Sequence, residues 1–115
     1  MSRYKEWPVT QRFKQEFPDF GEMDVEIPSD FEDQSWHNES CPCFHSETAQ
    51  AFLWVDYEDP ARREYEGALR FTLSVSIDGQ VPDDAREPLC STDDWAAMLK
   101  AIDARRAEMA ARPTA

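Results

Sequence analysis

The chain is poor in the residues that build phosphate-binding loops and disulfide frameworks. Its three glycines, at positions 21, 67 and 79, are too far apart for a glycine-rich loop that cradles a nucleotide phosphate. Three cysteines are an odd number, and no apolar run follows the N-terminal residues as a secretory signal would require. No segment approaches the roughly 20 apolar residues of a membrane span. We therefore expect a cytoplasmic protein with reduced thiols.

Basic residues are absent from a long stretch of the chain. The segment Gln15–Ala61 contains no Lys or Arg and holds 13 of the 24 acidic residues, and the whole chain has a formal charge of -12. Contact with nucleic-acid phosphates needs clustered Lys and Arg. In this chain the Lys and Arg residues that cluster do so only in twos. We expect repulsion from nucleic acid and from anionic membranes, and attraction to a basic protein.

Aromatic residues are plentiful for a chain of this charge. Hydrophobic residues make up 41% of the 115 positions and aromatic residues 12%, whereas acidic disordered chains contain few aromatic residues. A chain of this length corresponds to one domain. We predict a single folded domain over residues 1–115, with a frayed tail at 110–115.

Hydrophobic alternation predicts an antiparallel sheet. Residues 22–28 alternate between apolar and acidic side chains, as in a half-buried strand with an acidic outer face. Residues 51–57 are apolar on both faces and are typical of a central strand. Residues 69–77 alternate most clearly, and Asp78-Gly79 then favours a tight hairpin turn. Between the first two strands, residues 29–49 are predicted to be rich in turns.

Helix signals appear near both ends of the chain. Thr10 is a candidate cap for a short helix through Phe17, before Pro18. Residues 91–94 combine hydroxyl and acidic side chains that suit the start of a C-terminal helix. The apolar face of that helix consists of Trp95, Met98, Leu99 and Ile102. The sequence predicts an α+β fold, an antiparallel sheet of three to five strands with a C-terminal amphipathic helix packed on one face. Trp95 and Leu99 would insert against residues 71–75.

The acidic stretch is interspersed with aromatic residues, which suggests an interaction surface. Carboxylates would pair with Arg and Lys of a basic partner, giving fast, salt-sensitive association, and aromatic anchors would supply hot spots. The alternative is a solvated acidic face with the aromatic residues in the core. The predicted partner-binding residues are Asp19, Glu22, Asp24, Glu26, Asp30, Glu32, Asp33, Trp36, Asp56, Glu58 and Asp59.

Mimicry of DNA would require these carboxylates to converge on one face. A compact chain of this length has a radius of gyration of about 13 Å and is roughly 35 Å across. Duplex DNA of that length carries about 20 charges. A charge of -12 spread over the whole surface would imitate DNA poorly.

An alternative interpretation is a small zinc-binding accessory protein that uses Cys41, Cys43 and His45. These side chains would share one face of an extended segment, but successive ones would lie about 6.6 Å apart. Ligands of one tetrahedral zinc ion lie about 4 Å apart. A single ion would therefore require Pro42 to turn the chain.

No residue group forms a catalytic motif. A cysteine nucleophile needs a positive neighbour, and the sequence near Cys41 and Cys43 offers Glu39 and Glu47 instead. Carboxylates near the end of the central strand suit acid–base or Mg²⁺ chemistry, but no base lies in that segment to hold a phosphorylated substrate. We expect no catalytic residues and no cofactor.

Small size, one domain, strong acidity and the lack of a catalytic motif are shared with a known type of protein. In these respects the chain resembles the phage- and plasmid-borne inhibitors of bacterial defence, such as anti-CRISPR proteins. These proteins have no common motif, so no residue is carried over from them. The resemblance implies a non-enzymatic inhibitor that occupies a basic nucleic-acid-binding surface of a protein or nucleoprotein complex. We expect a monomer or a homodimer.

Overall fold

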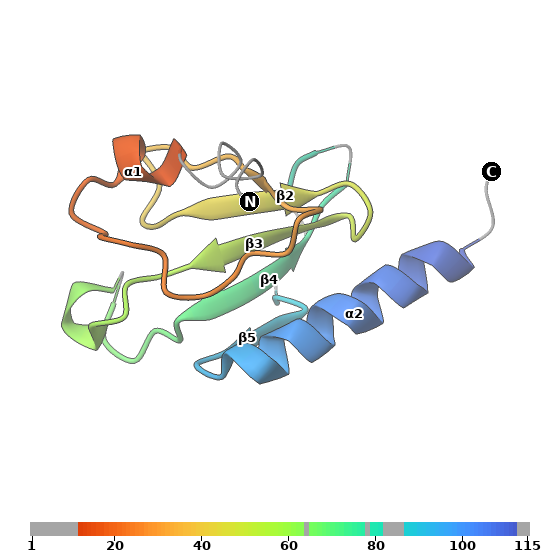
Figure 1. Ribbon diagram of the computed structural model, residues 1–115. Helices are drawn as coiled ribbons and strands as arrows, with labels where there is room; N and C mark the ends of the chain where they lie inside the picture. Colours follow the sequence, from red (N-terminus) through yellow and green to blue (C-terminus); the bar gives the residue numbers. More distant parts are fainter. Residues whose placement is uncertain (1–11, 64, 78, 82–86, 113–115) are drawn as a thin grey trace.

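The computed structural model describes residues 12–63, 65–77, 79–81 and 87–112 (Figure 1). Over these residues, five antiparallel strands form one sheet in the order β1-β2-β3-β4-β5. The strands are β1 (Glu32–Asp33), β2 (Cys43–Ser46), β3 (Ala51–Val55), β4 (Phe71–Val75) and β5 (Cys90–Thr92). The helices are α1 (Arg12–Glu16), the short 3-10 helix η3 (Pro60–Arg62) and α2 (Trp95–Ala111). The predicted α+β fold with a C-terminal helix is confirmed. No helix of the described part is long and apolar enough to cross a membrane.

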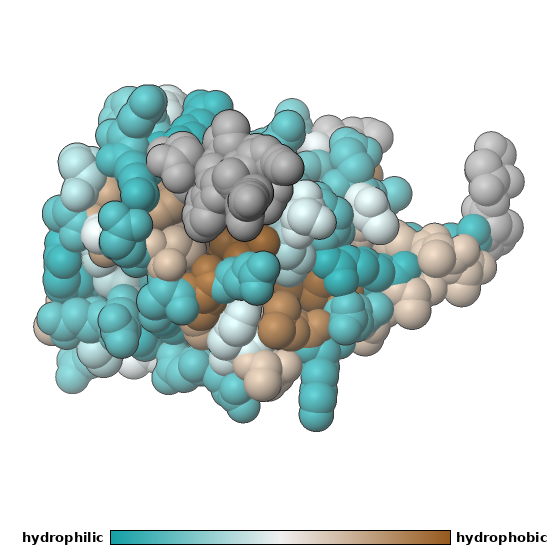
Figure 2. Space-filling model, in the orientation of Figure 1, coloured by the Kyte–Doolittle hydropathy of each residue, from teal (hydrophilic) through white to brown (hydrophobic). Residues whose placement is uncertain are grey.

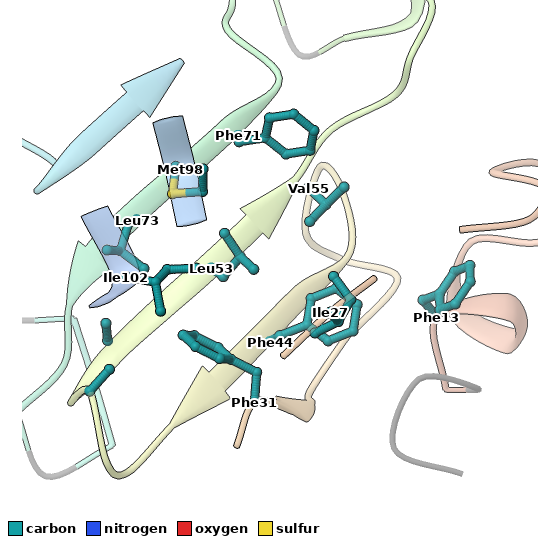
Figure 3. Close-up of a cluster of buried hydrophobic side chains, with 12 residues drawn as sticks. Phe13, Ile27, Phe31, Phe44, Leu53, Val55, Phe71, Leu73, Met98 and Ile102 are labelled. Carbon is teal, nitrogen blue, oxygen red and sulfur yellow. The ribbon is translucent and has the colours of Figure 1, made fainter. Parts of the chain in front are cut away.

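One face of the sheet, which we call the core face, carries the hydrophobic core. Its fully buried side chains include Phe44 of β2, Leu53 of β3 and Leu73 of β4, which are paired across neighbouring strands. Helix α2 and the segment 20–31 lie on the same side of the sheet (Figure 1), because both contribute to the same core cluster. Figure 3 shows how Met98 and Ile102 of α2 meet Leu73 in this core.

The opposite face of the sheet, which we call the second face, presents a more polar set of side chains. The register aligns Cys43, Trp54, Thr72 and Ser91 across the strands, and beside them His45, Phe52 and Ser74. The Thr72 and Ser91 hydroxyls lie 3.1 Å apart, and the rings of His45 and Phe52 are 4.6 Å apart. These contacts agree with the alternation of side chains between the two faces along each strand, and they place these side chains on the second face.

The prediction of a strand at 22–28 is wrong, although its burial pattern is right. Met23 and Val25 are half-buried and Ile27 is buried, while the acidic residues between them are exposed. The segment pairs with no strand of the described part of the chain and has an irregular backbone. Alternating burial requires only an extended segment lying on an apolar surface, and here that surface is the core. The pattern therefore does not distinguish a paired strand from a packed, unpaired segment.

The prediction that residues 29–49 are rich in turns did not include the strands β1 and β2, which lie in this segment. All four residues of β2 are buried, and Phe44 pairs with Leu53 of β3. The segment Cys43–Ser46 contains none of the β-branched residues that mark strands, and Pro42 stands directly before it. Its strand conformation comes from pairing with β3 rather than from local preference.

The strands β3 and β4 confirm the clearest sequence patterns. β3 is the middle strand of the five and is buried apart from partly exposed Trp54. After β4, Ile77 and Gln80 exchange backbone hydrogen bonds of 2.8 and 3.1 Å, and Gly79 has a φ of +79°. This confirms a tight turn as far as its described residues show it, whereas Asp78 lies outside them. Among the described residues after this turn, pairing with β4 resumes at Leu89, whose N–H donates to the carbonyl of Leu73 at 2.6 Å, and continues in β5.

Helix α2 packs on a face displaced from the predicted one. Its N-cap is Asp94, whose side chain accepts the backbone N–H of Ala96. Trp95 packs against Phe71, with ring centroids 4.9 Å apart, as expected. Leu99, however, is 36% exposed, so its predicted insertion is wrong. The buried residues of the helix are Met98, Ile102 and Arg105.

Arg105 accounts for part of this displacement. Its Nε donates to the carbonyl of Ala49 at 2.9 Å, and its Nη2 donates to the carbonyl of Gln50 at 3.2 Å. These bonds hold the helix to the β2–β3 turn and bring the Arg105 side of the helix against the sheet. The helix continues to Ala111, so residues 110 and 111 do not belong to a frayed tail.

At the other end, Phe13 of α1 and Phe17, the residue after the helix, are both buried. The backbone N–H of Phe17 donates to the carbonyl of Phe13 at 2.7 Å, which extends the helical turn to the residue before Pro18. The predicted cap, Thr10, lies outside the described residues.

Candidate partner-binding surface

Two carboxylates of the segment on the core face are held by arginines from elsewhere in the chain. Asp24 accepts both terminal nitrogens of Arg70, at 2.6 and 2.8 Å. Asp30 accepts the guanidinium of Arg106 at 2.5 and 3.1 Å and the hydroxyl of Ser46 at 2.8 Å. Folding therefore neutralises these acids with bases that lie outside the acidic stretch.

The pKa values of both carboxyls reflect these contacts. The hydrogen bonds from Arg70, followed by its charge, lower the pKa of Asp24 despite some burial. For Asp30, burial alone would raise the pKa, but the hydrogen bonds from Arg106 and Ser46 outweigh it and the pKa is lowered. Both groups are ionised in the folded protein at neutral pH.

Asp19 and Glu22 are also paired, but at the surface. Asp19 accepts the hydroxyl of Tyr57 at 3.0 Å and a guanidinium nitrogen of Arg62. The Arg62 guanidinium also lies over the Tyr57 ring, 4.5 Å from its centroid. Burial, followed by the bond to Asp19, raises the pKa of Tyr57 to about 12. Glu22 pairs with Lys14 at 3.0 Å.

Asp33 is buried, and its carboxylate accepts hydrogen bonds that stabilise the fold. One of its oxygens accepts the N–H of Phe13 at 2.8 Å, and the other accepts the N–H of Ser35 at 3.0 Å. Its side chain is therefore a cap for α1, supplied from β1. A side chain that is 7% exposed and bonded through both oxygens does not present charge to a partner.

The carboxylates after β3 have separate local roles. Asp56 is buried, and its Oδ1 accepts the N–H of Tyr57 at 2.8 Å. Asp59 caps η3 by accepting the N–H of Ala61 at 3.0 Å. Glu58 is exposed, and its backbone carbonyl, rather than its carboxylate, accepts Arg63.

Another set of acids has no ion-pair partner among the described residues, and four of its members border the second face. Glu32 pairs across the sheet with His45 and alternates with inward-pointing Asp33, which directs it to the second face. Glu39 and Glu87 line a cavity on that face. Glu47 lines a smaller cavity beside His45. We call Glu32, Glu39, Glu47 and Glu87 the second-face carboxylates.

The larger cavity has a volume of about 690 Å³. Trp54, Thr72 and Ser74 line it from the sheet, and Tyr65 and Leu69 line it from the connection before β4. Tyr65 is 65% exposed and Leu69 is 42% exposed. Both side chains therefore leave apolar surface open to solvent at the cavity.

Trp36 lies in the β1–β2 connection, three residues before Glu39. It is 48% exposed and begins a turn in which the N–H of Glu39 donates to its carbonyl at 2.9 Å. Its ring meets the neighbouring His37 ring edge-on, at 5.8 Å. His37 is held by Glu16 at 2.8 Å. An exposed aromatic side chain thus lies in the same β1–β2 connection as Glu39.

The predicted partner residues do not converge on one face. Asp24, Glu26 and Asp30 belong to the segment on the core face, whereas Glu32 points to the second face. Figure 2, in the orientation of Figure 1, shows that hydrophilic residues cover most of the visible surface, with apolar residues near its middle. The acidic stretch is therefore divided between two sides of the molecule.

The residues of the zinc-binding alternative have other surroundings. Among the described residues, no three His, Cys, Asp or Glu side chains are grouped as a metal site requires. The ring nitrogen Nε2 of His45 lies 2.8 Å from the Ser76 hydroxyl. Cys41 and Cys43 are both 4% exposed. Burial, followed by the charges of Cys41 and Glu39, raises the pKa of the Cys43 thiol strongly, which disfavours a thiolate ligand or nucleophile.

Comparison with known protein families, with characterised proteins and with solved structures gives no match to this chain. A role for the second face is therefore inferred from its geometry alone. The assignment of Trp36 and Glu32 to partner binding stays a prediction, and nothing in the sequence indicated the cavity. The cavity is lined from the β1–β2 connection, β3, the connection before β4, β4 itself and the segment before β5, and no local pattern links these parts of the chain.

Proposed function

We propose that the chain is a non-enzymatic inhibitor that binds the basic, nucleic-acid-binding surface of a partner protein, in the manner of the anti-CRISPR type of protein that it resembles. The observation that carries this proposal is the position of the second-face carboxylates. They have no basic partner among the described residues, and two of them, Glu39 and Glu87, line one cavity together with exposed Tyr65.

The chemistry of this surface suits a basic protein. Exposed carboxylates accelerate association with a positive surface and make it sensitive to salt. Aromatic side chains such as Trp36 and Tyr65 supply the well-packed contacts that dominate binding energy. The acidic residues on the core face contribute less, because Arg70, Arg106 and Lys14 already neutralise much of their charge.

The acidic residues are divided between two sides of the molecule, so only a local contact with a basic surface is proposed. The longest dimension of the molecule is 43 Å, and duplex DNA of that length carries about 25 charges. The second-face carboxylates are far fewer than that. We therefore propose occupation of a basic patch rather than imitation of a duplex.

The test begins with a pull-down from a bacterial lysate by the tagged chain, at about 50 mM and about 500 mM salt. We expect a basic nucleic-acid-binding protein that is retained at low salt, lost at high salt, and displaced by its own nucleic acid. A partner that binds equally well at both salt concentrations would argue against a charge-based contact.

Charge reversals then locate the surface. Glu32→Lys combined with Glu39→Lys should weaken partner binding at least tenfold, about 1.4 kcal/mol. Glu26→Lys is the matched control, because Glu26 is an equally exposed acid of the same stretch but lies on the core-face side. Equal effects from the two variants would contradict the assignment to the second face. Circular dichroism of each variant shows whether the fold is retained.

A further inference from the structure

The cavity on the second face has the size of a small-ligand site and an unusual lining. At about 690 Å³ it falls within the range of about 300–1,000 Å³ for pockets that hold small ligands or side chains. Its floor includes Trp54 of the middle strand β3, whose side chain is only partly buried. Tyr65 stands at its edge and is 65% exposed. The cavity therefore offers aromatic rings to an incoming group.

Carboxylates approach these rings from different parts of the chain. Glu39 lies in the connection before β2, on one side of β3, and Glu87 lies before β5, on the other side. Both are exposed and have no ion-pair partner among the described residues. Aromatic faces attract cations through their quadrupole, and carboxylates bind guanidinium groups through paired hydrogen bonds. The combination recognises a cation.

Arg70, the one basic residue among the described residues of the lining, does not cancel this negative charge. Arg70 directs both terminal nitrogens to Asp24, at 2.6 and 2.8 Å, and its Nε to the carbonyl of Asp56 at 3.0 Å. Its side chain is only 9% exposed. Its charge is therefore already matched, and the cavity disfavours an anionic ligand such as a phosphate.

We propose that this cavity is the socket for one cationic side chain of the basic partner, an arginine in preference to a lysine. Arginine suits it better because the guanidinium is planar, weakly hydrated and able to stack on an aromatic ring while it pairs with a carboxylate. This inference rests on the proposed function and adds the residue chemistry by which the partner is recognised.

The direct test uses a short probe and the whole protein. We would titrate the ¹⁵N-labelled protein with the peptide acetyl-Gly-Arg-Gly-amide and follow amide and indole signals by NMR. Matched probes carry lysine, or citrulline, a neutral analogue of arginine. We expect millimolar binding of the arginine peptide, with shifts at the Trp54 indole and the Glu39 amide. The lysine peptide should bind more weakly, and the citrulline peptide should give no shifts.

Variants separate the cavity from general acidity. Glu39→Gln with Glu87→Gln should weaken binding of the arginine peptide at least fivefold, whereas Glu26→Gln should leave it unchanged. Trp54→Leu should weaken it as well, and the surface variants keep the test decisive if this core-adjacent change disturbs folding. Shifts centred elsewhere, equal binding of the citrulline peptide, or equal losses in the Glu26→Gln control would overturn the socket.

The experiments distinguish failure of the arginine socket from failure of the proposed function. If a basic partner is captured but binds the Glu39→Gln and Glu87→Gln double variant as well as the wild type, the socket is wrong and the function stands. If no basic partner is captured while the arginine peptide binds in the cavity, the function is wrong and the cation site stands.

Discussion

Arg70 and Asp24 are 46 residues apart in the chain and form an ion pair through two parallel hydrogen bonds. Arg70 immediately precedes β4, and Asp24 lies in the irregular segment that covers the core. The guanidinium also contacts the face of the Phe71 ring, 4.9 Å from its centroid. The pair therefore fastens the acidic segment to the sheet, and an acid that suggested a binding surface acts as a link in the fold.

Replacing Asp24 should destabilise the protein. Asp24→Asn removes the charge that matches Arg70, whose side chain is 9% exposed, whereas that of Asp24 is 42% exposed. Breaking a fully buried pair costs about 3–5 kcal/mol, and solvent screening of the exposed partner reduces this to about 1–2 kcal/mol. Urea denaturation would measure the change. Glu26→Gln, two residues further on, should change the free energy of unfolding by less than about 0.5 kcal/mol, and an equal loss there would refute the specific role of the pair.

Stability should fall in acid because Asp24 and Asp30 have lowered pKa values. A carboxyl whose pKa is lower in the folded than in the unfolded protein stabilises the fold above its unfolded pKa, and this contribution disappears as pH falls through the folded value. The ordinary value is 3.8, so we expect the loss to begin near pH 4 and to continue below it. Urea midpoints over this range should fall less steeply for Asp30→Asn than for the wild type. Parallel curves would show that Asp30 does not contribute.

Removing the cap supplied by Asp33 should loosen α1. Asp33→Ala leaves the buried N–H groups of Phe13 and Ser35 without their acceptors, which costs about 1–3 kcal/mol. Amide hydrogen exchange should accelerate at Phe13 and Ser35 before it does in β3. The neighbouring Glu32→Ala is the control, since Glu32 is exposed and its loss should leave both amides protected. Unchanged protection of Phe13 in Asp33→Ala would exclude the capping role.

The cysteines should differ in reactivity. Cys43 is buried and has a strongly raised pKa, first because of burial, whereas Cys90 is partly exposed. Because the thiolate is the reactive form, iodoacetamide should modify Cys90 at least about tenfold faster than Cys43 in the native protein. Mass spectrometry of peptides at successive times would measure both rates. Modification of Cys43 ahead of Cys90 would contradict the buried placement of β2.

The sequence predicted the parts of the fold that carry their own pattern. Strands β3 and β4 and helix α2 contain apolar residues at regular spacing, because each of these elements buries one or both faces along its length. β2 could not be identified in this way, since its residues have weak strand preference and depend on pairing with β3. Residues 22–28 were predicted to be a strand but are not one. Their alternation of apolar and acidic side chains reflects packing on the core and not pairing with a neighbouring strand.

The surface was less predictable than the fold, because charge in a sequence does not show which acids the fold will neutralise. Asp24 and Asp30 meet Arg70 and Arg106 only through tertiary contacts across 46 and 76 residues. Asp33 was predicted to be a partner-binding acid in a turn-rich segment, and its bonds to the N–H groups of Phe13 and Ser35 arise only from the tertiary fold. Glu32 has no ion-pair partner among the described residues, and its role in binding a partner stays a prediction.

Helix α2 offers a direct test of which face is buried. Met98 is fully buried and Leu99 is 36% exposed, although the sequence suggested that Leu99 would insert into the core. Met98→Ala should lower the free energy of unfolding by about 2–5 kcal/mol, because it removes buried methylene groups and leaves a cavity. Leu99→Ala removes a similar apolar volume from a partly exposed position and should cost less than about 1 kcal/mol. Alanine has a high helix propensity, so neither change weakens the helix itself. Thermal or urea unfolding of the two variants would compare them directly. A larger loss for Leu99→Ala would mean that the helix is rotated toward the face predicted from its sequence.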